Sequence, residues 1–382
     1  MKLPSIKEIL TNGKTGETYR VGGWIRNTRD TRLTKFASLS DGSYSKPLQL
    51  VFEKSAFNSE ILDRIWVGAS LIVEGPLVES PGKEQNVELK VKSILHLGEC
   101  SQEEYPLQPK WHSFEFLREN AHLRLRTNLF SAIFRVRSYI SYEIHRFFQE
   151  RGFIYFHSPI ITPSDCEGAG HLFTVTTLED TLSDFSRDFF SRRTYLTVSG
   201  QLEAEAGACA LTKVYTFGPT FRAEPSYTPR HLSEFWMIEP EVAFYELPDI
   251  MDLAEEFIKY LIKQSLTNLR DDLLTIYTIL AKNVSKFSPE EKLKQLEHYL
   301  NAPFNRISYT TAIEIIKSSP PYKNQSFKYL IDWGDDLQTE HEKYLVDQHF
   351  KAPVFIYDYP AEIKAFYMTV SYTHLRAHET GR

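Results

Sequence analysis

The stretch that most constrains the fold runs from Phe221 to Glu241, FRAEPSYTPRHLSEFWMIEPE, where charged side chains alternate with aromatic ones. The apolar run VYTFGPTF leads into the polar segment AEPSYTPRHLS, and EFWMIEPEVAF follows with strand-like alternation. Two such runs joined by a proline-containing polar segment predict an antiparallel hairpin with a long loop. The hairpin is expected to present five residues on one side: Arg222, Glu224, Arg230, His231 and Phe235.

This set of side chains suits a nucleotide. Guanidinium groups contact phosphate oxygens in pairs, and an aromatic ring stacks on a base. We therefore predict a cradle for a nucleoside triphosphate that uses no glycine-rich loop. The alternative is a hairpin whose charged residues only face solvent, which is the commoner arrangement for any single one of them.

The hairpin segment is similar to the second signature motif of the class II aminoacyl-tRNA synthetases, which reads Phe-Arg-x-Glu, a variable loop, Arg-His and a later Phe. The resemblance implies that ATP binds bent over an antiparallel sheet. It places Arg222 at the α-phosphate, and Arg230 and His231 at the outer phosphates. It also puts Phe235 under the adenine and Glu224 at the substrate amide or the adenine amino group. The implied catalytic residues are Arg222, Glu224, Arg230 and His231.

The region from Thr18 to His96 is predicted to form a small barrel. Five runs alternate like strands: TYRVGGWIRNT, KFASLSDGS, LQLVFE, ASLIVEGPLVES and NVELKVKSILHL. A helical segment, SAFNSEILDRIW, separates the third run from the fourth. This order is typical of an oligonucleotide-binding (OB) barrel, although another small Greek-key barrel fits the same propensities.

Two residues of this barrel are candidates for base recognition. Phe36 lies on the second predicted strand and Gln49 on the third, so they are expected to be cross-strand neighbours. A ring stacks on bases and an amide reads their edges, although a strand Phe is more often part of a core. In the aspartyl and asparaginyl synthetases an N-terminal barrel reads the anticodon. The resemblance places its stacking Phe on Phe36, its base-reading Gln on Gln49 and an acidic contact on Glu88.

Residues 101–125 are polar and proline-containing, which indicates a hinge that touches the tRNA. Apolar residues at helical spacing then predict a long amphipathic helix ending at Gly152. The segment after it resembles the first class II motif, with Pro163 and the triplet Glu167-Gly168-Ala169. In the family this motif forms the homodimer interface, so we expect a homodimer through Gly152–Gly170 and Glu167 beside the substrate amino acid.

The segment TYLTVSGQLEAEAGACAL predicts a strand, a turn at Ser199-Gly200 and a short helix. At a helix N-terminus, free N–H groups meet a carboxylate and side-chain carboxylates meet an ammonium. Plain capping, with Ser199 as N-cap and Glu203 at the reciprocal position, explains the same residues. Ser-Gly-Gln-Leu-x-Ala-Glu is typical of asparaginyl enzymes, whereas aspartyl enzymes usually carry Ser-Pro-Gln. The resemblance implies an asparagine site of Glu167, Ser199, Gln201, Glu203 and Glu224, with Glu205 beside it.

The C-terminal half is predicted to hold helices over LPDIMDLAEEFIKYLIKQSL and 268–300, a helix after Ser308, a loop at SPPYKNQ and a strand at APVFIYDY. The resemblance continues through Lys364 and Phe366 and stops at Thr369. The family continues with a metal-binding Glu and a third motif whose Arg contacts the γ-phosphate, and TVSYTHLRAHETGR contains neither. We therefore expect negligible aminoacylation from these 382 residues alone.

Composition excludes few classes. The net charge of −6 argues against a protein that grips nucleic acid over its whole surface, although the first forty residues carry eight basic and three acidic side chains, a surplus of five. No apolar run approaches the roughly 20 residues of a membrane helix, so a cytoplasmic location is expected. Cys100, Cys166 and Cys209 stand far apart, which indicates buried free thiols rather than a disulfide or zinc site.

The prediction is a multidomain chain: an OB-fold anticodon-binding barrel (1–100), the hinge segment (101–125), an incomplete class II α+β domain with an antiparallel sheet flanked by helices (126–368) and a non-family tail (369–382). The expected reaction joins L-asparagine to tRNA(Asn) through an asparaginyl-adenylate, with ATP and Mg²⁺ as cofactors and no retained metal ligand. Three alternatives stay open. They are an aspartyl-tRNA synthetase, an asparagine synthetase of the same catalytic fold without the barrel, and a tRNA-binding fragment without catalysis.

Overall fold

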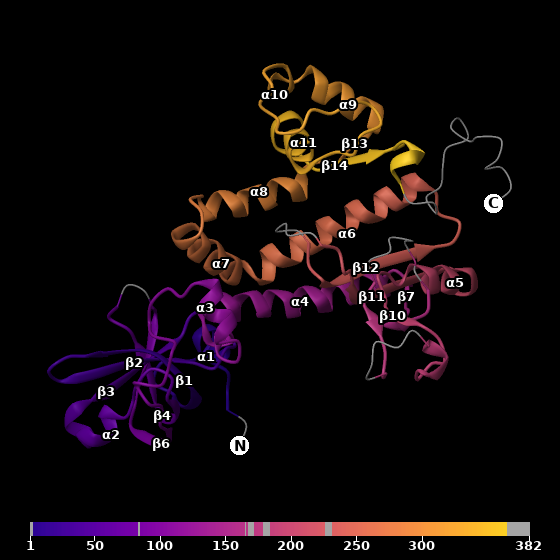
Figure 1. Cartoon of the computed structure of the whole chain (residues 1–382). Helices are drawn as coiled ribbons and strands as arrows, with labels where there is room; N and C mark the ends of the chain where they lie inside the picture. Colours follow the sequence, from indigo (N-terminus) through magenta and orange to yellow (C-terminus); the bar gives the residue numbers. More distant parts are fainter. Residues whose placement is uncertain are drawn as a thin grey trace, which may run out of the picture. The chain divides into compact units, whose positions relative to one another are not determined.

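The computed structural model describes residues 3–82, 85–164, 166, 172–178, 184–225 and 231–364 (Figure 1). Contacts divide the chain into two compact units. The first joins Met1–Ser141 to Gln264–Leu296, and the second joins Tyr142–Lys263 to Glu297–Arg382. The first half of the long helix after residue 127 therefore groups with the N-terminal barrel.

The N-terminal strands close into the predicted barrel. They are β1 (Thr18–Asp30), β2 (Thr34–Ser40), β3 (Leu48–Glu53), β4 (Ser70–Glu79), β5 (Val87–Lys90) and β6 (Ser93–Gly98). The order β1-β2-β3-β5-β4 returns to β1, because β1 also pairs with β4. Helix α2 (Ser59–Asp63) lies between β3 and β4 as predicted, and β6 adds a further partner along β4. The last predicted strand is two strands in the structure.

The barrel core follows the alternation of the strands. Inward positions such as Leu39 and Val73 are fully buried, whereas their neighbours on the same strand are partly exposed. An additional helix, α1 (Ile6–Asn12), covers part of this core with Ile6 and Ile9. Its N-terminus is a capping box formed by Ser5 and Glu8.

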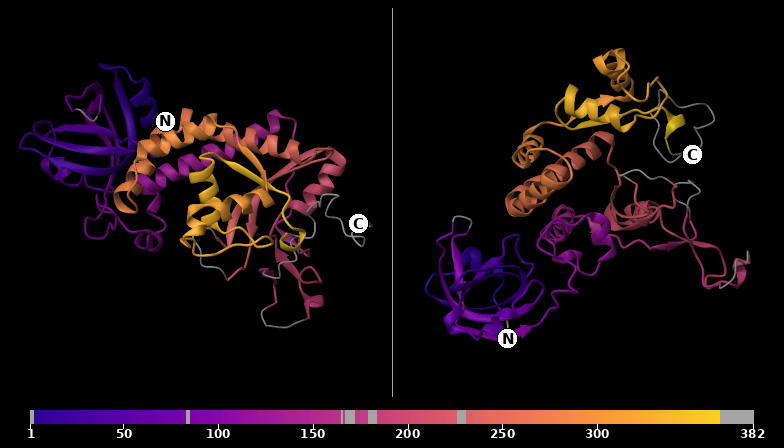
Figure 2. Two further views of the ribbon diagram at one scale, coloured as in Figure 1. Left: turned by 90° about the horizontal axis from the view of Figure 1, so that it is seen from above. Right: turned by 60° about the vertical axis from the view of Figure 1, so that its left-hand side comes forward.

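Two long helices lie side by side in Figures 1 and 2: α4 (Asn128–Glu150) and α6 (Leu247–Asn268). The Phe147 ring packs against Phe257 and Tyr260, with centroids 5.0 and 5.3 Å apart. Helix α4 ends at Glu150, and the predicted cap glycine, Gly152, follows it with a φ of 78°. The N–H of Phe153 donates to the Phe148 carbonyl at 3.0 Å, which completes a Schellman motif and turns the chain sharply.

The second unit carries the predicted hairpin, β11 (Lys213–Phe221) with β12 (Glu234–Val242). The two strands pair without interruption from Lys213 opposite Val242 to Phe221 opposite Glu234. Strand β7 (Ile154–Tyr155) adds in parallel to β11. A separate small sheet orders β8 (Ile161–Thr162), β10 (Thr194–Leu196) and β9 (Thr174–Val175), and helix α5 (Gln201–Leu211) packs on the hairpin.

Further helices and strands of the described residues belong to the two units. They are α3 (Phe114–Glu119), α7 (Arg270–Asn283), α8 (Pro289–Asn301), β13 (Asn305–Ser308), α9 (Tyr309–Ser318), α10 (Pro320–Lys323), α11 (Thr339–Lys343), a π-helical turn (Tyr344–His349) and β14 (Val354–Tyr357). Strands β13 and β14 pair in parallel. The loop predicted at SPPYKNQ is wrong in its first half. Ser319 caps a short helix, α10, whose first positions tolerate proline.

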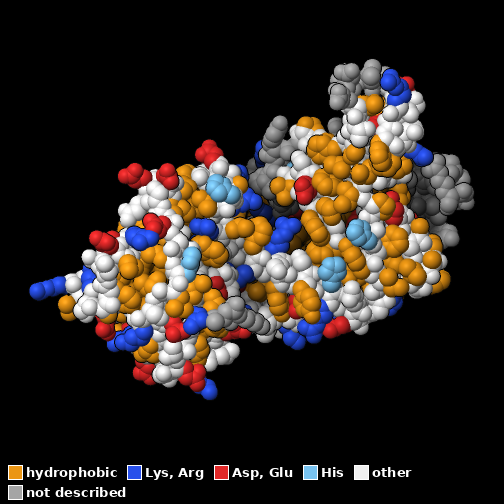
Figure 3. Space-filling view, turned by 90° about the horizontal axis from the view of Figure 1, so that it is seen from below, with side chains coloured by type: hydrophobic (Ala, Val, Ile, Leu, Met, Phe, Trp, Pro, Cys, Tyr) orange, Lys and Arg blue, Asp and Glu red, His pale blue; other side chains and the backbone are white. Residues whose placement is uncertain are grey.

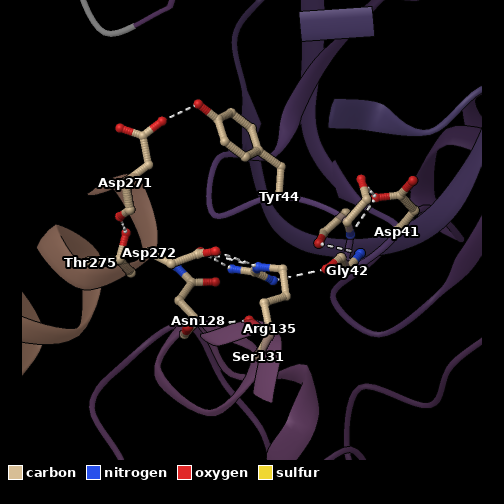
Figure 4. A network of polar contacts seen from close by, with 11 residues as sticks. Asp41, Gly42, Tyr44, Asn128, Ser131, Arg135, Asp271, Asp272 and Thr275 are labelled. Carbon is tan, nitrogen blue, oxygen red and sulfur yellow. Dashed lines mark hydrogen bonds and ion pairs between the residues drawn. The ribbon is translucent and has the colours of Figure 1, made fainter. Parts of the chain in front are cut away.

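A polar network ties the barrel to two helices within the first unit (Figure 4). The Arg135 guanidinium of α4 donates to both Asp272 carboxylate oxygens of α7 at 2.6 to 3.2 Å, and to the Gly42 carbonyl of the β2–β3 loop at 2.8 Å. Tyr44 of the same loop donates its hydroxyl to Asp271. Both side chains of the Arg135–Asp272 pair are largely buried, so this contact fixes the loop against both helices.

Two expectations from the sequence can be compared with the structure. One concerns the burial of the three cysteines, and the other concerns helices that could span a membrane. Cys166 is buried and Cys100 is partly buried, but Cys209 is exposed on α5, so the expectation of buried thiols is wrong for Cys209. Within the described residues, no helix combines the length and the apolarity that crossing a membrane requires.

Candidate active site

The hairpin gathers its functional side chains on one face. Because strand side chains alternate and the β11–β12 register is unbroken, every second residue of each strand points the same way. We call this the hairpin face, formed by Thr216, Gly218, Thr220 and Arg222 with Phe235, Met237, Glu239 and Glu241. The predicted phosphate-binding and base-stacking residues therefore share one side of the sheet.

Four predicted residues meet at the loop end of the hairpin face. The Arg222 guanidinium lies over the Phe235 ring, 5.3 Å from its centroid. The Arg222 N–H donates to the Ser233 carbonyl at 3.1 Å, which extends the ladder beyond the strands. His231 Nε2 lies 3.8 Å from a Glu224 carboxylate oxygen. Two further predicted residues, Arg230 and Glu167, lie outside the described residues, as does Phe366.

The start of α5 joins the hairpin face through Glu239. The Glu239 carboxylate accepts hydrogen bonds from the Gly200 N–H at 3.1 Å, from the Thr216 hydroxyl at 2.6 Å and from the Ser199 hydroxyl. Ser199 is 5% exposed. Since β12 side chains advance about 6.6 Å for every two residues, Glu239 and Phe235 lie roughly 13 Å apart along one face.

Plain helix capping does not describe this turn. Gly200, not Ser199, is the N-cap residue of α5, and no side chain caps the helix there. The Ser199 hydroxyl instead accepts from the Gln201 N–H at 3.1 Å while it donates to Glu239. Glu203 lies in the first turn without a capping box. The alternative weighed for Ser199 and Glu203 is therefore wrong, because Glu239 orders the turn from a different strand.

A group of carboxylates lies beside this turn. The Gln201 side-chain amide donates to Glu205 at 2.8 Å. Burial, together with the neighbouring Glu205 and Glu239 carboxylates, raises the pKa of Glu241 to about 7. Negative charges held this close together favour a cation among them. Sequence reasoning included Glu205 but missed Glu239 and Glu241, although their even spacing from Phe235 places all three on one strand face.

A cavity of about 290 Å³ lies along the edge of β11. The segment 155–160 forms one wall, and Gly200, Thr216, Gly218 and Glu239 contribute to the others. A Cβ atom added to Gly218 would meet no atom within 4 Å. The hairpin face is therefore open above Gly218, between the Arg222 end and the Glu239 end.

The barrel holds the residues predicted to read a base. Phe36 pairs with Val51 and Gln49 pairs with Ser38, so Phe36 and Gln49 are diagonal neighbours on the outer face. The Gln49 amide donates to Glu88 at 2.9 Å. Glu88 is 6% exposed, and it also accepts from the Ser80 hydroxyl at 3.1 Å. The structure thus brings Gln49 and Glu88 into contact.

Comparisons with known proteins agree with this geometry. The sequence model of tRNA synthetases class II (D, K and N) matches residues 113–380, and that of the OB-fold nucleic acid binding domain matches residues 19–97. The asparagine–tRNA ligase of Acetivibrio thermocellus is 48% identical over 97% of the chain and 80% of its own length. The chain belongs to the asparaginyl-tRNA synthetases of class II.

Two further relatives support this assignment of the synthetase. The asparagine–tRNA ligase of Desulfitobacterium hafniense is 49% identical, over 96% of the synthetase chain and 78% of its own length. The crystal structure of asparaginyl-tRNA synthetase from Pyrococcus horikoshii complexed with asparaginyl-adenylate matches with a TM-score of 0.79 at 28% identity, covering 98% of this chain and 78% of that one. The predicted architecture, an OB-fold barrel followed by a class II domain, is confirmed, and the chain spans about four-fifths of these relatives.

Proposed function

We propose that this synthetase joins L-asparagine to tRNA(Asn) in two steps, through an asparaginyl-adenylate formed from ATP. One observation carries the proposal: the Ser199–Glu239 contact joins the asparaginyl-type turn to the same hairpin face that holds Arg222 and Phe235. Relatives at 48% and 49% identity are asparagine–tRNA ligases, which favours asparagine over aspartate as the substrate.

ATP would lie along the hairpin face from Phe235 toward Gly218. Phe235 stacks under the adenine, and Arg222 neutralises the α-phosphate, with Arg230 and His231 on the outer phosphates. The contact between Arg222 and the Phe235 ring supports this arrangement, because it holds a cation next to the stacking surface before ATP arrives. Glu224 receives the adenine amino group or the substrate amide.

Asparagine would occupy the Glu239 end of the same face. The carboxylates near Gln201 attract its ammonium, with Glu167, Ser199 and Glu203 completing the site and Glu224 at its amide. The substrate carboxylate attacks the α-phosphorus, the bond to the bridging oxygen breaks and pyrophosphate leaves with the bonding electrons. A ribose hydroxyl of the tRNA then attacks the acyl carbon, releasing AMP. Such chemistry depends on positioning and on charge neutralisation by Arg222.

In this proposal Mg²⁺ binds only as part of its complex with ATP. Across the part of the chain that the structure describes, no group of three or more His, Cys, Asp or Glu side chains is placed to hold a metal ion. We therefore expect Mg²⁺ to arrive on the ATP phosphates, and no step is assigned to it.

The barrel is proposed to read the anticodon through Phe36, Gln49 and Glu88. The Gln49–Glu88 hydrogen bond supports this role because it orients the amide for a base edge. Arg29 lies 4.9 Å from the Phe36 ring centroid, which places a positive charge beside the stacking surface. A cytoplasmic location, where tRNA is charged, accompanies this proposal.

A homodimer through Gly152–Gly170 also belongs to the proposal. Figure 3 shows hydrophobic side chains gathered over much of the right-hand part of the view. Ile154, Tyr155, Ile160 and Ile161 are each more than one-third exposed, and a surface rich in such residues favours association.

Amino-acid choice is tested by ligand binding and by exchange. Titration calorimetry with ATP present should detect asparagine and miss aspartate at equal concentration, and any pyrophosphate exchange should depend on asparagine. Arg222→Gln should weaken ATP binding, whereas Arg118→Gln, an exposed arginine of the first unit, should not. Binding or exchange that requires aspartate would overturn the choice of asparagine.

A further inference from the structure

A second, larger cavity lies within the first unit. Its volume is about 630 Å³, within the range of sites that hold small ligands. Strand β1, the segment 105–112, the start of α4 and the C-terminal end of α7 line it. We call it the hinge cavity, and the anticodon and active-site roles proposed above leave it unassigned.

The charges around the hinge cavity are all of one sign. Four basic residues line it: Arg26, Lys110, Arg126 and Lys282. None of the described residues that line it is an aspartate or a glutamate. Within the described ranges, no ion pair involves any of these four side chains. A concave surface lined by one sign of charge concentrates ligands of the other sign.

Arg26 owes its position to an irregularity of β1. The pairing with β2 shifts between Ile25 and Asn27, so Arg26 is the extra residue of a β-bulge. Bulges redirect a side chain and often adjoin functional sites. Burial lowers the pKa of the Arg26 guanidinium, and the charge of Arg126 acts in the same direction against an opposing effect of Tyr105. An anion between the two arginines would relieve this repulsion.

Aromatic rings complete the lining. Tyr105, Trp111 and His112 contribute to the hinge cavity. Trp111 is 39% exposed, so part of a large ring is open to a ligand. Arg126 itself lies 5.9 Å from the Tyr105 centroid. Rings beside arginines favour a ligand that combines a planar group with phosphate.

The hinge cavity also adjoins the face proposed to read the anticodon. Ser38 lines the cavity and pairs with Asn27 on one side and with Gln49 on the other. The row Asn27–Ser38–Gln49 therefore connects the cavity with a proposed base-reading residue. A nucleic acid bound on that face passes close to the cavity.

We propose that the hinge cavity binds a nucleotide, with its phosphate between Arg26 and Arg126 and its base against Trp111. The nucleotide belongs either to the bound tRNA or to the free pool. The first source rests on the proposed function, and the second does not.

Two variants of the full chain test the site. Arg26→Gln removes the bulge cation, and Lys282→Gln removes an exposed one from the rim. Lys294→Gln is the matched control, since it removes the same charge from an exposed position of the same unit outside the lining. Removing a desolvated charge should leave the melting temperature of the Arg26 variant unchanged or higher. A lower melting temperature would show that Arg26 supports the fold. The Lys282→Gln variant alone would then test the site.

The tRNA source is tested with a tRNA(Asn) transcript at several salt concentrations. Arg26→Gln should weaken binding about tenfold and reduce the salt slope by about 1, and Lys282→Gln should reduce the slope similarly. The free source is tested by equilibrium dialysis of AMP, where wild type should bind two AMP per chain and Arg26→Gln one. Either result supports the site and names its source.

Two results would overturn the proposal: an unchanged salt slope together with the same AMP stoichiometry in wild type and Arg26→Gln, or an equal change in Lys294→Gln. Asparagine and ATP binding should be the same in all three variants. A wild-type chain that binds neither asparagine nor tRNA would instead contradict the proposed function, and AMP dialysis would still decide the hinge cavity.

Discussion

Glu239 shows how much one side chain organises at the residue scale. Its carboxylate accepts from Ser199, Gly200 and Thr216, and thereby holds the turn before α5 against β11. Glu241 lies two residues further along the same strand face and carries a strongly raised pKa. These two glutamates share a face but differ in task, since Glu239 accepts three hydrogen bonds whereas Glu241 has its pKa raised by burial and by the neighbouring carboxylates.

The first prediction concerns pH and Glu241. Its folded-state pKa of about 7 exceeds the 4.5 of an ordinary glutamate, so between these pH values the unfolded chain loses a proton that the folded chain keeps. Stability therefore falls as pH rises through this window. Glu241→Gln should melt at a higher temperature than wild type above pH 7 and at an equal one below pH 4.5.

A second substitution tests whether the neighbouring carboxylates cause this effect. The Glu205 carboxylate is one of the two charges that raise the pKa of Glu241. In a Glu205→Gln background, the pH-dependent difference in melting temperature should shrink. A difference that stays constant from pH 4 to pH 8 would contradict the raised pKa.

The second prediction concerns open space over Gly218. A Cβ atom at this position would point onto the hairpin face and meet no atom of the described residues within 4 Å, so Gly218→Val should fold normally. It should weaken ATP or asparagine binding by about tenfold, because the added methyl groups fill the substrate volume. In Gly200→Ala the added Cβ would lie 2.6 Å from the Ser158 hydroxyl, so that variant should lose stability instead. Calorimetry and thermal melting distinguish the two losses.

At the scale of elements, helix α4 is anchored at both ends. Near its start, Arg135 joins the β2–β3 loop and α7 in the network of Figure 4. Near its end, the glycine at 152 turns the chain into β7 and the segment beside the β11 cavity. The helix thus connects, along one continuous element, the residues that hold the barrel loop with those that border the candidate active site.

The third prediction concerns that network. Arg135→Gln leaves Asp272 buried without its charged partner and removes the donor to Gly42, so the free energy of unfolding should fall by on the order of 3 kcal/mol. Arg137→Gln on the same helix is the control. Arg137 is an exposed residue of α4, so urea unfolding of this variant should barely change. Equal effects in the two variants would show that the network adds little.

Local patterns of the sequence determined which elements were predicted. The hairpin and barrel strands follow a period of two, which a short window detects. The capping box of Ser5 and Glu8 is also local and was available, although α1 was missed. The contacts of Glu239 could not be predicted from a local pattern, because Ser199 lies 40 residues away and only the folded chain brings them together. The β-bulge at Arg26 depends likewise on pairing that no local pattern specifies.

At the scale of the whole molecule, the chain combines a nucleic-acid-binding barrel with a class II domain. The predicted domain boundaries at 100, 125 and 368 stay predictions, since the compact units divide the chain by contacts and interleave distant segments. A helix such as α7 groups with the barrel although the chain reaches it only after the hairpin. Each unit of the proposed enzyme therefore forms only when segments far apart in the sequence pack together.

The fourth prediction concerns assembly of two chains. Sedimentation should give twice the mass of one chain, and Ile161→Arg should give one, because an arginine at an apolar interface is costly to bury. Leu33→Arg is the control, as Leu33 is 75% exposed on the barrel. A monomeric wild type, or a dimer that tolerates Ile161→Arg, would contradict an interface through Gly152–Gly170.

The unbroken ladder between β11 and β12 also bears on how such a sequence can evolve. One residue inserted in β12 between Phe235 and Glu239 would put these two side chains on opposite faces of the sheet, so strand length is under strict constraint. Insertions in the connecting loop leave every strand side chain on its own face of the sheet. They add little to the entropic cost of closing the loop. Loop length is thus free to drift among descendants while the strands keep their length, and the reach of the loop's basic residues can adapt to new substrates.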